Sequence, residues 1–345
     1  MSELFVLDAS FSTLRAESFT NDAVGRLVQN AVTGTGADTV SLDRTLVNSV
    51  DETTSQRLDS WKVIDQKNSG RCWEFAGLNV LRAKVIDELK VDDFQFSQNY
   101  IAFFDKLEKA NHTLSRATAT ASRDASEEEV RSIMDYPSED GGWWFQFTDI
   151  VAKYGLVPSR AMPDTESAGN TAQMNQALAT VLRRAIGRIR EGATNSDPAE
   201  GSAHMEAVRN EALNAVWRIL AIHLGTPPTS FMWQYRDKDK NFHRKGTYTP
   251  LKFAHEIVPQ AFDPWLALAH DPREEHPVGR TYVHEHTPYM EGGTPYWHLS
   301  VGLDLLKKTI VESIADGEPV WFSCDVKKQF DKDLGICDAE LRRFG

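Results

Sequence analysis

The sequence predicts an α+β protein, and two features of the chain indicate this class. Up to about residue 227 apolar residues recur at helical spacing, most clearly over 73–89 and in two long amphipathic segments between Met174 and Ile222. From Pro228 onward the composition shifts to short strand-like runs separated by turn residues. With 345 residues, the chain is long enough for two domains or for one domain with a large insertion.

Residues 1–60 mix helical and turn signals, and Thr33-Gly34-Thr35-Gly36 divides them into two parts. Their Ser- and Thr-rich composition is typical of a segment that wraps around a folded domain. We therefore expect a retained structural extension, with a propeptide as the alternative.

The chemistry centres on the stretch from Gln66 to Asn79. A polar turn through Ser69-Gly70 leads directly into an apolar helix and places Cys72 in its first turn. Free backbone N–H groups and the positive end of the helix dipole stabilise a thiolate at this position, which favours a nucleophile. The Gln66 side-chain amide and the Cys72 backbone N–H are two donors suited to an oxyanion hole. The alternative is a structural cysteine that is buried where a core helix begins.

The order Gln66, five residues, Cys72-Trp73 resembles the nucleophile segment of papain-like cysteine peptidases. The fuller run from Ser69 to Asn79 resembles the bleomycin hydrolase/aminopeptidase C branch, which carries Gly-Arg-Cys-Trp where papain carries Gly-Ser-Cys-Trp. The resemblance implies a papain-like fold, with Cys72 as nucleophile, Gln66 in the oxyanion hole and Trp73 beside the substrate.

The segments that follow predict a helical domain. The apolar pattern over 73–89 indicates a central helix buried nearly all round, and Ser97 is a plausible N-cap for a helix over 99–108. That second helix resembles the Ser-Gln-Asn-Tyr helix of the family. Residues 111–140 are polar, so we expect a solvated helix and loop rather than a functional acidic cluster.

Adjacent glycines at Gly141 and Gly142 precede an aromatic helix start. Two glycines let another backbone come close, which a peptide-binding cleft needs for extended-strand hydrogen bonds. A plain tight turn is the alternative. Because Asp140-Gly141-Gly142 and the run from Lys153 to Pro158 resemble family motifs in the same order, the resemblance implies that both glycines bind the substrate backbone.

The second half of the chain predicts an insertion and then a sheet domain. The two amphipathic segments, separated by a loop over 192–198, resemble the helical insertion that this branch adds. Strands are expected at 230–235, 242–248, 282–286 and 318–326, and helices at 249–251 onward and 301–315. Together with the resemblance, this gives an extension over 1–60, a helical papain-like domain over 61–165, an insertion over 166–227 and the start of a β-barrel domain, incomplete, over 228–345.

A cysteine peptidase also needs a histidine next to its sulfur. In the family this histidine and an asparagine lie in later segments, and the sequence ends at Gly345 before any such motif. His204 and His223 fall at papain-type spacing from Cys72, but both lie in or beside the second amphipathic segment, and His298 is a weaker candidate. We therefore expect this chain by itself to be inactive or nearly so.

His284 and His286 would share one face of a strand, a spacing that metal sites use. No third ligand stands at a defined distance from them, so a pair of surface histidines is the preferred interpretation. We expect neither a metal ion nor a cofactor.

Composition limits the partners and the location. The net charge of −12 argues against nucleic acid, which needs a basic footprint. Three cysteines are few and odd in number, which fits a reducing compartment, and no run has the length of a signal peptide or a membrane span. We expect a cytoplasmic location.

The predicted function is that of a thiol aminopeptidase acting on peptides through an acyl-enzyme at Cys72, in a homo-oligomer if it assembles as hexameric relatives do. The alternative is a non-catalytic oligomeric scaffold that keeps the fold, and a metal-dependent hydrolase using His284 and His286 is a third hypothesis.

Overall fold

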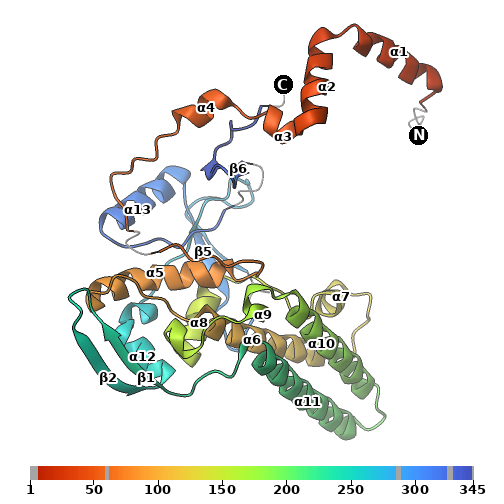
Figure 1. Cartoon of the computed structure of the whole chain (residues 1–345). Helices are drawn as coiled ribbons and strands as arrows, with labels where there is room; N and C mark the ends of the chain where they lie inside the picture. Colours follow the sequence, from red (N-terminus) through yellow and green to blue (C-terminus); the bar gives the residue numbers. More distant parts are fainter. Residues whose placement is uncertain (1–6, 59–61, 285–288, 325–328, 344–345) are drawn as a thin grey trace. The chain divides into compact units, whose positions relative to one another are not determined.

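The structure, a computed structural model, describes residues 7–58, 62–284, 289–324 and 329–343 (Figure 1). The chain divides into two compact units. The larger unit consists of Gln56–Trp321, and the smaller unit joins Met1–Ser55 to Phe322–Gly345. Helices with small sheets make up the described chain, as expected for an α+β protein.

The helices of the larger unit run in chain order from the Cys72 segment onward: α5 Cys72–Leu89, α6 Gln98–Ala119, α7 Glu128–Asp135, α8 Trp144–Tyr154, α9 Glu166–Gly169, α10 Ala172–Ala193, α11 Pro198–Leu224, α12 Pro250–Ile257 and α13 Leu303–Ala315. Short 3-10 turns lie at Ser159–Ala161 and Pro259–Phe262. The strands of this unit are β1 Phe231–Arg236, β2 Phe242–Tyr248, β3 Leu268–Ala269, β4 Thr281–His284 and β5 Tyr296–Ser300.

Helix α5 is central to the larger unit, as its apolar pattern predicts. Side chains on all of its faces are buried, including Leu78, Leu81 and Val85, and it packs against α6 and α8. It ends at Leu89, and the following residue, Lys90, adopts a left-handed conformation with φ of 52°. The fixed position of this helix determines where its first residue, Cys72, lies.

Helix α6 begins as predicted but is longer than expected. The Ser97 side chain accepts a hydrogen bond from the Tyr100 N–H at 3.0 Å and caps the helix. The helix then continues to Ala119 rather than ending near residue 108, because Ala110, Leu114 and Ala117 are buried against neighbouring helices. The expectation of a solvated segment is therefore wrong for the first part of 111–140.

Helices α10 and α11 form the predicted amphipathic pair and pack against each other and against α6 (Figure 1). Their facing sides are buried: Leu182 and Ile189 on α10, and Val216 and Leu220 on α11, are inaccessible to solvent. Asp197 caps α11 by accepting from the N–H groups of the first turn. The periodic apolar residues thus form core, not a ligand site.

The predicted strands are partly confirmed. β1 and β2 form an antiparallel hairpin, while β5 lies between antiparallel β4 and parallel β3. Thr249 caps α12 with Pro250 in its first turn, as expected. The strand predicted at 318–326 is wrong for its described part, 318–324, because no described segment pairs with it and Phe322 is exposed; residues 325 and 326 lie outside the described residues.

The smaller unit contains short elements: α1 Ala9–Thr20, α2 Ala23–Thr35, α3 Ala37–Val40, α4 Arg44–Ser49, β6 Phe330–Asp331 and β7 Ile336–Cys337. Gly36, with φ of 89°, separates α2 from α3 at the predicted break. Backbone bonds join its two chain segments, from the Asp43 N–H to the Leu341 carbonyl at 2.9 Å and from the Arg343 N–H to the Ser41 carbonyl at 2.8 Å.

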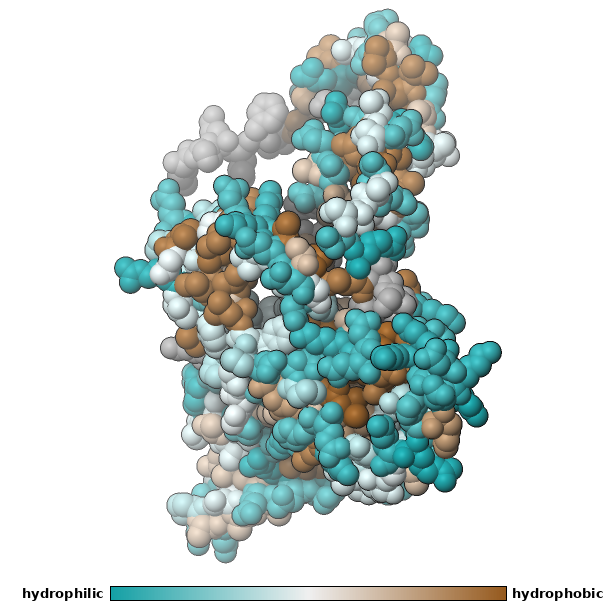
Figure 2. All heavy atoms as spheres, turned by 90° about the vertical axis from the view of Figure 1, so that its left-hand side faces the viewer, coloured by the Kyte–Doolittle hydropathy of each residue, from teal (hydrophilic) through white to brown (hydrophobic). Residues whose placement is uncertain are grey.

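Helices α1 and α2 bury none of their residues. Leu14 on α1 is 64% exposed and Leu27 on α2 is 69% exposed. In Figure 2 hydrophobic side chains lie among hydrophilic ones at the top of the view, where Figure 1 places these helices. Their apolar side chains therefore remain available to another surface.

Within the described residues, no helix is both long enough and apolar enough to cross a membrane.

Candidate active site

A tight turn over residues 66–69 precedes α5. Lys67 takes a left-handed conformation with φ of 56°, and the Ser69 hydroxyl donates to the Gln66 carbonyl at 2.6 Å. The Asn68 N–H bonds to the Gly169 carbonyl at 3.0 Å, which ties the turn to the end of α9. These bonds fix the residues immediately before the helix.

Cys72 is the first residue of α5, and its side chain is exposed. Arg71 occupies the N-cap position, and no side-chain hydrogen bond caps the helix in the described structure. The first N–H groups of an α-helix have no partner within the helix. An exposed thiol at such an end lies where developing negative charge is stabilised.

The Gln66 amide belongs to the same turn. Its Nε2 donates to the Ser69 carbonyl. An amide nitrogen carries two hydrogens, so this bond uses one of them and fixes the direction of the other. The role of Gln66 in an oxyanion hole stays a prediction, because the contact that defines the role needs a substrate.

Arg71 has a structural role that the sequence reasoning missed. Its guanidinium makes two parallel bonds to the Asp164 carboxylate at 3.0 Å each, and its Nε donates to the Ser69 hydroxyl at 3.1 Å. The group also lies over the Phe75 ring at 5.2 Å. A bidentate arginine fixes direction as well as distance. The start of α5 is therefore anchored to the segment that precedes α9. The sequence gives no local signal for this contact, because Asp164 lies 93 positions after Arg71.

The predicted glycine pair lies against the turn that precedes Cys72. A β-carbon on Gly70 would be 2.1 Å from the Cβ of Asp140, so only glycine fits there. The Gly141 N–H donates to the Gly70 carbonyl at 3.2 Å, and Gly141 itself has φ of 89°. The structure thus brings Gly141 next to the residues that precede Cys72.

Trp73 lies behind the second glycine. A β-carbon on Gly142 would approach two ring atoms of Trp73 to 2.7 Å, and Trp73 is only 4% exposed. The ring therefore forms the support on which Gly142 rests. Direct contact of Trp73 with a substrate stays a prediction.

Buried charged side chains lie beside the loop of Asp140, Gly141 and Gly142, and the sequence did not predict them. The Lys109 ammonium bonds to the Asp105 carboxylate at 2.9 Å, and the Lys106 ammonium bonds to Asp140 at 2.5 Å. Glu74, in the first turn of α5, is 1% exposed, and its Oε2 has no hydrogen-bond partner in the described structure. An i, i+4 pattern on α6 was the available signal for the Asp105–Lys109 pair.

Burial and mutual repulsion change the ionisation of these groups. Burial, followed by repulsion from Asp105, raises the pKa of Glu74 well above its ordinary value. Burial also raises the pKa of Asp105 and lowers the pKa of Lys106. Burial alone would raise the pKa of Asp140, but Lys106, with Asn175 and Lys109, outweighs burial and the pKa is lowered. Asp140 is therefore a carboxylate, whereas Glu74 is disposed to hold a proton.

The histidines weighed from the sequence have other neighbours. His223, in the last turn of α11, bonds to the Ser167 hydroxyl at 2.8 Å, and His204 lies near Gly192 at the other end of that helix. His298, in β5, packs against the Tyr282 ring, and burial lowers its pKa. None of the three bonds to Cys72 among the described contacts.

For the proposed metal pair, His284 lies in β4, whereas His286 lies outside the described residues. Within the described parts of the chain, no group of three or more histidine, cysteine, aspartate or glutamate side chains is placed to hold a metal ion.

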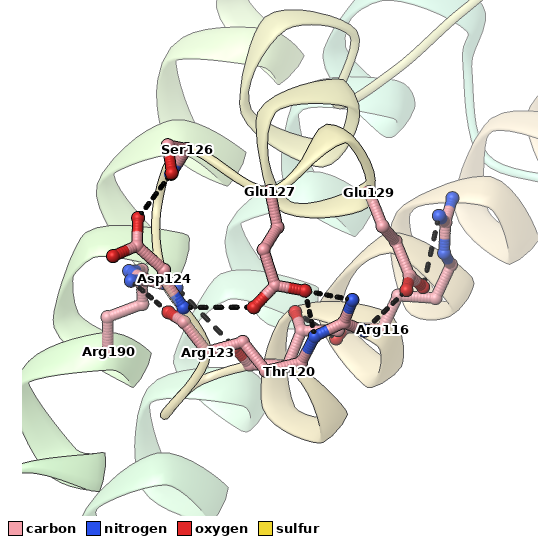
Figure 3. A network of polar contacts seen from close by, with 8 residues as sticks. All are labelled: Arg116, Thr120, Arg123, Asp124, Ser126, Glu127, Glu129 and Arg190. Carbon is pink, nitrogen blue, oxygen red and sulfur yellow. Dashed lines mark hydrogen bonds and ion pairs between the residues drawn. The ribbon is translucent and has the colours of Figure 1, made fainter.

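A cavity of about 690 Å³ lies beside the segment that precedes the glycines. Lys109 and Glu139 line it together with side chains of α6 and α7. Figure 3 shows the ion pairs on its charged side, where the Arg123 guanidinium pairs with Glu127 and with Glu129. Cys72 is not among the described residues that line it. The cavity therefore borders the segment around Glu139 rather than Cys72.

Comparison with known proteins identifies the family. The model of the peptidase C1-like family matches residues 7–345. The chain belongs to the peptidase C1-like family. It is 37% identical over 287 residues to bleomycin hydrolase of Homo sapiens, covering 81% of this chain and 62% of that protein. It is 36% identical over 293 residues to aminopeptidase C of Listeria monocytogenes, covering 85% of this chain and 65% of that protein.

Among solved structures, the crystal structure of PepW from Lactobacillus rhamnosis is similar, with a TM-score of 0.92 and 31% identity. The match covers 98% of this chain and 75% of that chain. The papain-like α+β fold predicted from the sequence is confirmed by this likeness and by the family. The chain spans less than two thirds of the length of the two curated relatives named above.

Proposed function

We propose that this member of the peptidase C1-like family is a thiol aminopeptidase that cleaves peptides through Cys72. The observation that carries the proposal is the position of Cys72: an exposed thiol on the first residue of α5, whose N-terminus no described side chain caps. Relatives named aminopeptidase C and bleomycin hydrolase support the same activity.

In this proposal the Cys72 sulfur attacks the carbonyl carbon of the scissile peptide bond. The S–H bond of the thiol breaks, the C–S bond forms and the C–N bond breaks, and the departing amine takes up the proton that the thiol loses. The Cys72 N–H and the Gln66 amide stabilise the oxygen on which negative charge develops. Water then hydrolyses the thioester and restores the thiol.

The peptide backbone is proposed to bind along Gly141 and Gly142. Both glycines are partly accessible, and Gly142 makes no backbone hydrogen bond in the described structure. An extended peptide recognises such free N–H and C=O groups by adding to them as a strand does.

We also propose that residues 1–345 assayed alone hydrolyse peptides very slowly. Proton transfer needs an imidazole within hydrogen-bond reach of the sulfur, and no described hydrogen bond joins His204, His223 or His298 to Cys72. Hydrolysis of an aminoacyl fluorogenic amide at an ordinary peptidase rate, abolished by Cys72→Ala, would contradict this part of the proposal.

Peptide-directed alkylation tests the function without requiring turnover. An iodoacetyl dipeptide and iodoacetamide carry the same electrophile, and mass spectrometry measures each rate at Cys72. A peptide site should make Cys72 react about tenfold faster with the dipeptide, whereas Cys324 and Cys337, also exposed, serve as internal references. Equal rates at Cys72 would favour the non-catalytic scaffold instead.

Two further properties belong to this proposal. A homo-oligomer is supported by the exposed apolar side chains of α1 and α2. A cytoplasmic location is supported by the three free cysteines. Sedimentation velocity and cell fractionation would test these properties.

A further inference from the structure

Two lysines of α6 converge on the loop formed by Glu139, Asp140 and Gly141. The Lys109 ammonium donates to the Gly141 carbonyl at 2.5 Å and to the Glu139 carbonyl at 3.2 Å. The Lys106 ammonium donates to the same Glu139 carbonyl at 2.9 Å. With Asp105, these contacts occupy all three donors of Lys109.

These lysines are unusual in their burial. The Lys109 side chain is 3% exposed and the Lys106 side chain is 5% exposed. Buried lysines are rare, and a buried ion pair adds little net stability because desolvation offsets the attraction. What such pairs supply is a fixed geometry, and here they fix the carbonyls of Glu139 and Gly141 on either side of the Asp140–Gly141 peptide group.

Each peptide group of this loop has an identified partner. The Glu139 carbonyl is bonded to both lysines, the Gly141 N–H is bonded to the Gly70 carbonyl, and the Gly141 carbonyl is bonded to Lys109. In a planar trans peptide the C=O and the following N–H point in opposite directions. Because the Gly141 carbonyl points inward to Lys109, the Gly142 N–H points away from that buried ammonium.

We infer that Lys109 is a positioning residue for substrate recognition: it orients and polarises the Gly141–Gly142 peptide so that the Gly142 N–H donates to a carbonyl of the bound peptide. A cation on the carbonyl strengthens the N–H of the same peptide group as a donor. The residue acts through Gly142 and does not contact the reacting atoms. The inference rests on the proposed function, since it names the recognition device of that site.

Lys109 also neutralises Asp105, so its removal alone would leave a buried carboxylate unpaired. The test therefore uses Asp105→Asn and the double variant Asp105→Asn/Lys109→Met, which differ only in the lysine. Lys252→Met, at an exposed lysine of α12, is the matched control. Melting temperatures establish that the variants are folded.

The measurement is the ratio of Cys72 alkylation rates with an iodoacetyl dipeptide and with iodoacetamide. We expect Asp105→Asn and Lys252→Met to keep the ratio of the unaltered protein, and the double variant to lose about tenfold. A dipeptide probe whose acceptor carbonyl is replaced by an alkene should lose the same factor on the unaltered protein. On the double variant that replacement should change little, an outcome that a merely structural role for Lys109 would not produce.

A dipeptide preference that persists within twofold in the double variant would overturn the role of Lys109 alone. No preference in the unaltered protein would overturn the proposed function and this inference with it. Where the double variant does not fold, Asp105→Asn/Lys109→Gln keeps the pair neutral and retains a shorter, neutral donor at position 109. We expect it to lose part of the preference, and an unchanged ratio would again contradict the inference.

Discussion

At the scale of single residues, steric fit decides how closely the loop of Asp140, Gly141 and Gly142 approaches the turn before Cys72. Gly70 faces Asp140 at a distance that admits no β-carbon, and Gly142 faces Trp73 in the same way. Glycine is required at these positions because a neighbouring side chain occupies the space, and not only because a turn is present. Gly187, in α10, offers a contrast, since a β-carbon added there would meet no atom within 4 Å.

Gly70→Ala should destabilise the protein, by about 1–3 kcal/mol, because Asp140 and its loop must move. Gly187→Ala should stabilise it by roughly 0.5–1 kcal/mol, because alanine is the better helix former and meets no obstacle. Urea unfolding of both variants measures the difference. Equal and small effects would show that the Gly70 contact relaxes without cost.

The raised pKa of Glu74 gives stability a pH dependence of known sign. The folded state retains the Glu74 proton above the ordinary pKa of 4.5, so the unfolded state binds fewer protons as pH rises and stability falls. Glu74→Gln removes this titration. Its melting temperature relative to the unaltered protein should therefore rise as pH increases from about 4.5 toward 8, since that is where the unfolded group ionises first.

Charged groups around Glu74 also affect its ionisation. Asp105 also has a raised pKa, and Arg71, Lys106 and Lys109 favour the charged form of Glu74. Glu88→Gln, at an exposed site in the last turn of α5, is the control and should show no such trend. A difference between Glu74→Gln and the unaltered protein that stays constant with pH would contradict the prediction.

At the scale of elements, one contact outside the helix anchors the start of α5. The Arg71 guanidinium holds Asp164 with two bonds, and the side chains are 4% and 35% exposed. By comparison, Arg188 and Glu211 pair between α10 and α11 with side chains 37% and 66% exposed. The same types of group thus occur in a nearly buried and in a solvated setting.

Arg71→Lys should destabilise the protein by about 1–3 kcal/mol, because a lysine cannot make both parallel bonds. Arg188→Lys should change stability by less than about 0.5 kcal/mol, as exposed pairs contribute little. Urea unfolding measures both, and the iodoacetamide rate at Cys72 reports whether the start of α5 has moved. Identical unfolding curves for the two variants would show that Arg71 is not an anchor.

At the scale of the whole molecule, the internal contacts group into two units. The smaller unit joins residues from both ends of the chain, through the bonds of Ser41 and Asp43 to Leu341 and Arg343. The four-part division, with its insertion over 166–227, stays a proposal about how the family plan is distributed along the chain.

Cleavage between Ser55 and Gln56 should leave the melting temperature of the larger unit unchanged within about 2 °C, because each unit has its own internal contacts. A specific protease site inserted there would test this by calorimetry. The same protease recognition sequence, inserted between Asp124 and Ala125 instead, is the control. It would interrupt the loop that Arg190 and the Arg123 ion pairs hold (Figure 3), and should lower the melting temperature. Equal losses at both sites would contradict the division.

The sequence by itself determined the elements whose cause is local. The apolar periodicity of α5, α10 and α11, the Ser97 and Thr249 caps and the β1–β2 hairpin follow from neighbouring residues, and the Gly-Arg-Cys-Trp motif indicated the family. These features depend on contacts within a few residues, which a pattern records directly.

Only the tertiary structure decided what lies beneath the Cys72 turn. Asp164 meets Arg71 across 93 positions of sequence, and Lys109 meets Gly141 across 32. From the sequence alone, a lysine on a helix is expected to be solvated. Whether it is buried, and with which partners, depends on the distant segments of backbone that pack beside it. The sequence therefore singled out Cys72, Gly141 and Gly142, and the structure supplied the charged side chains that bond to the residues around them.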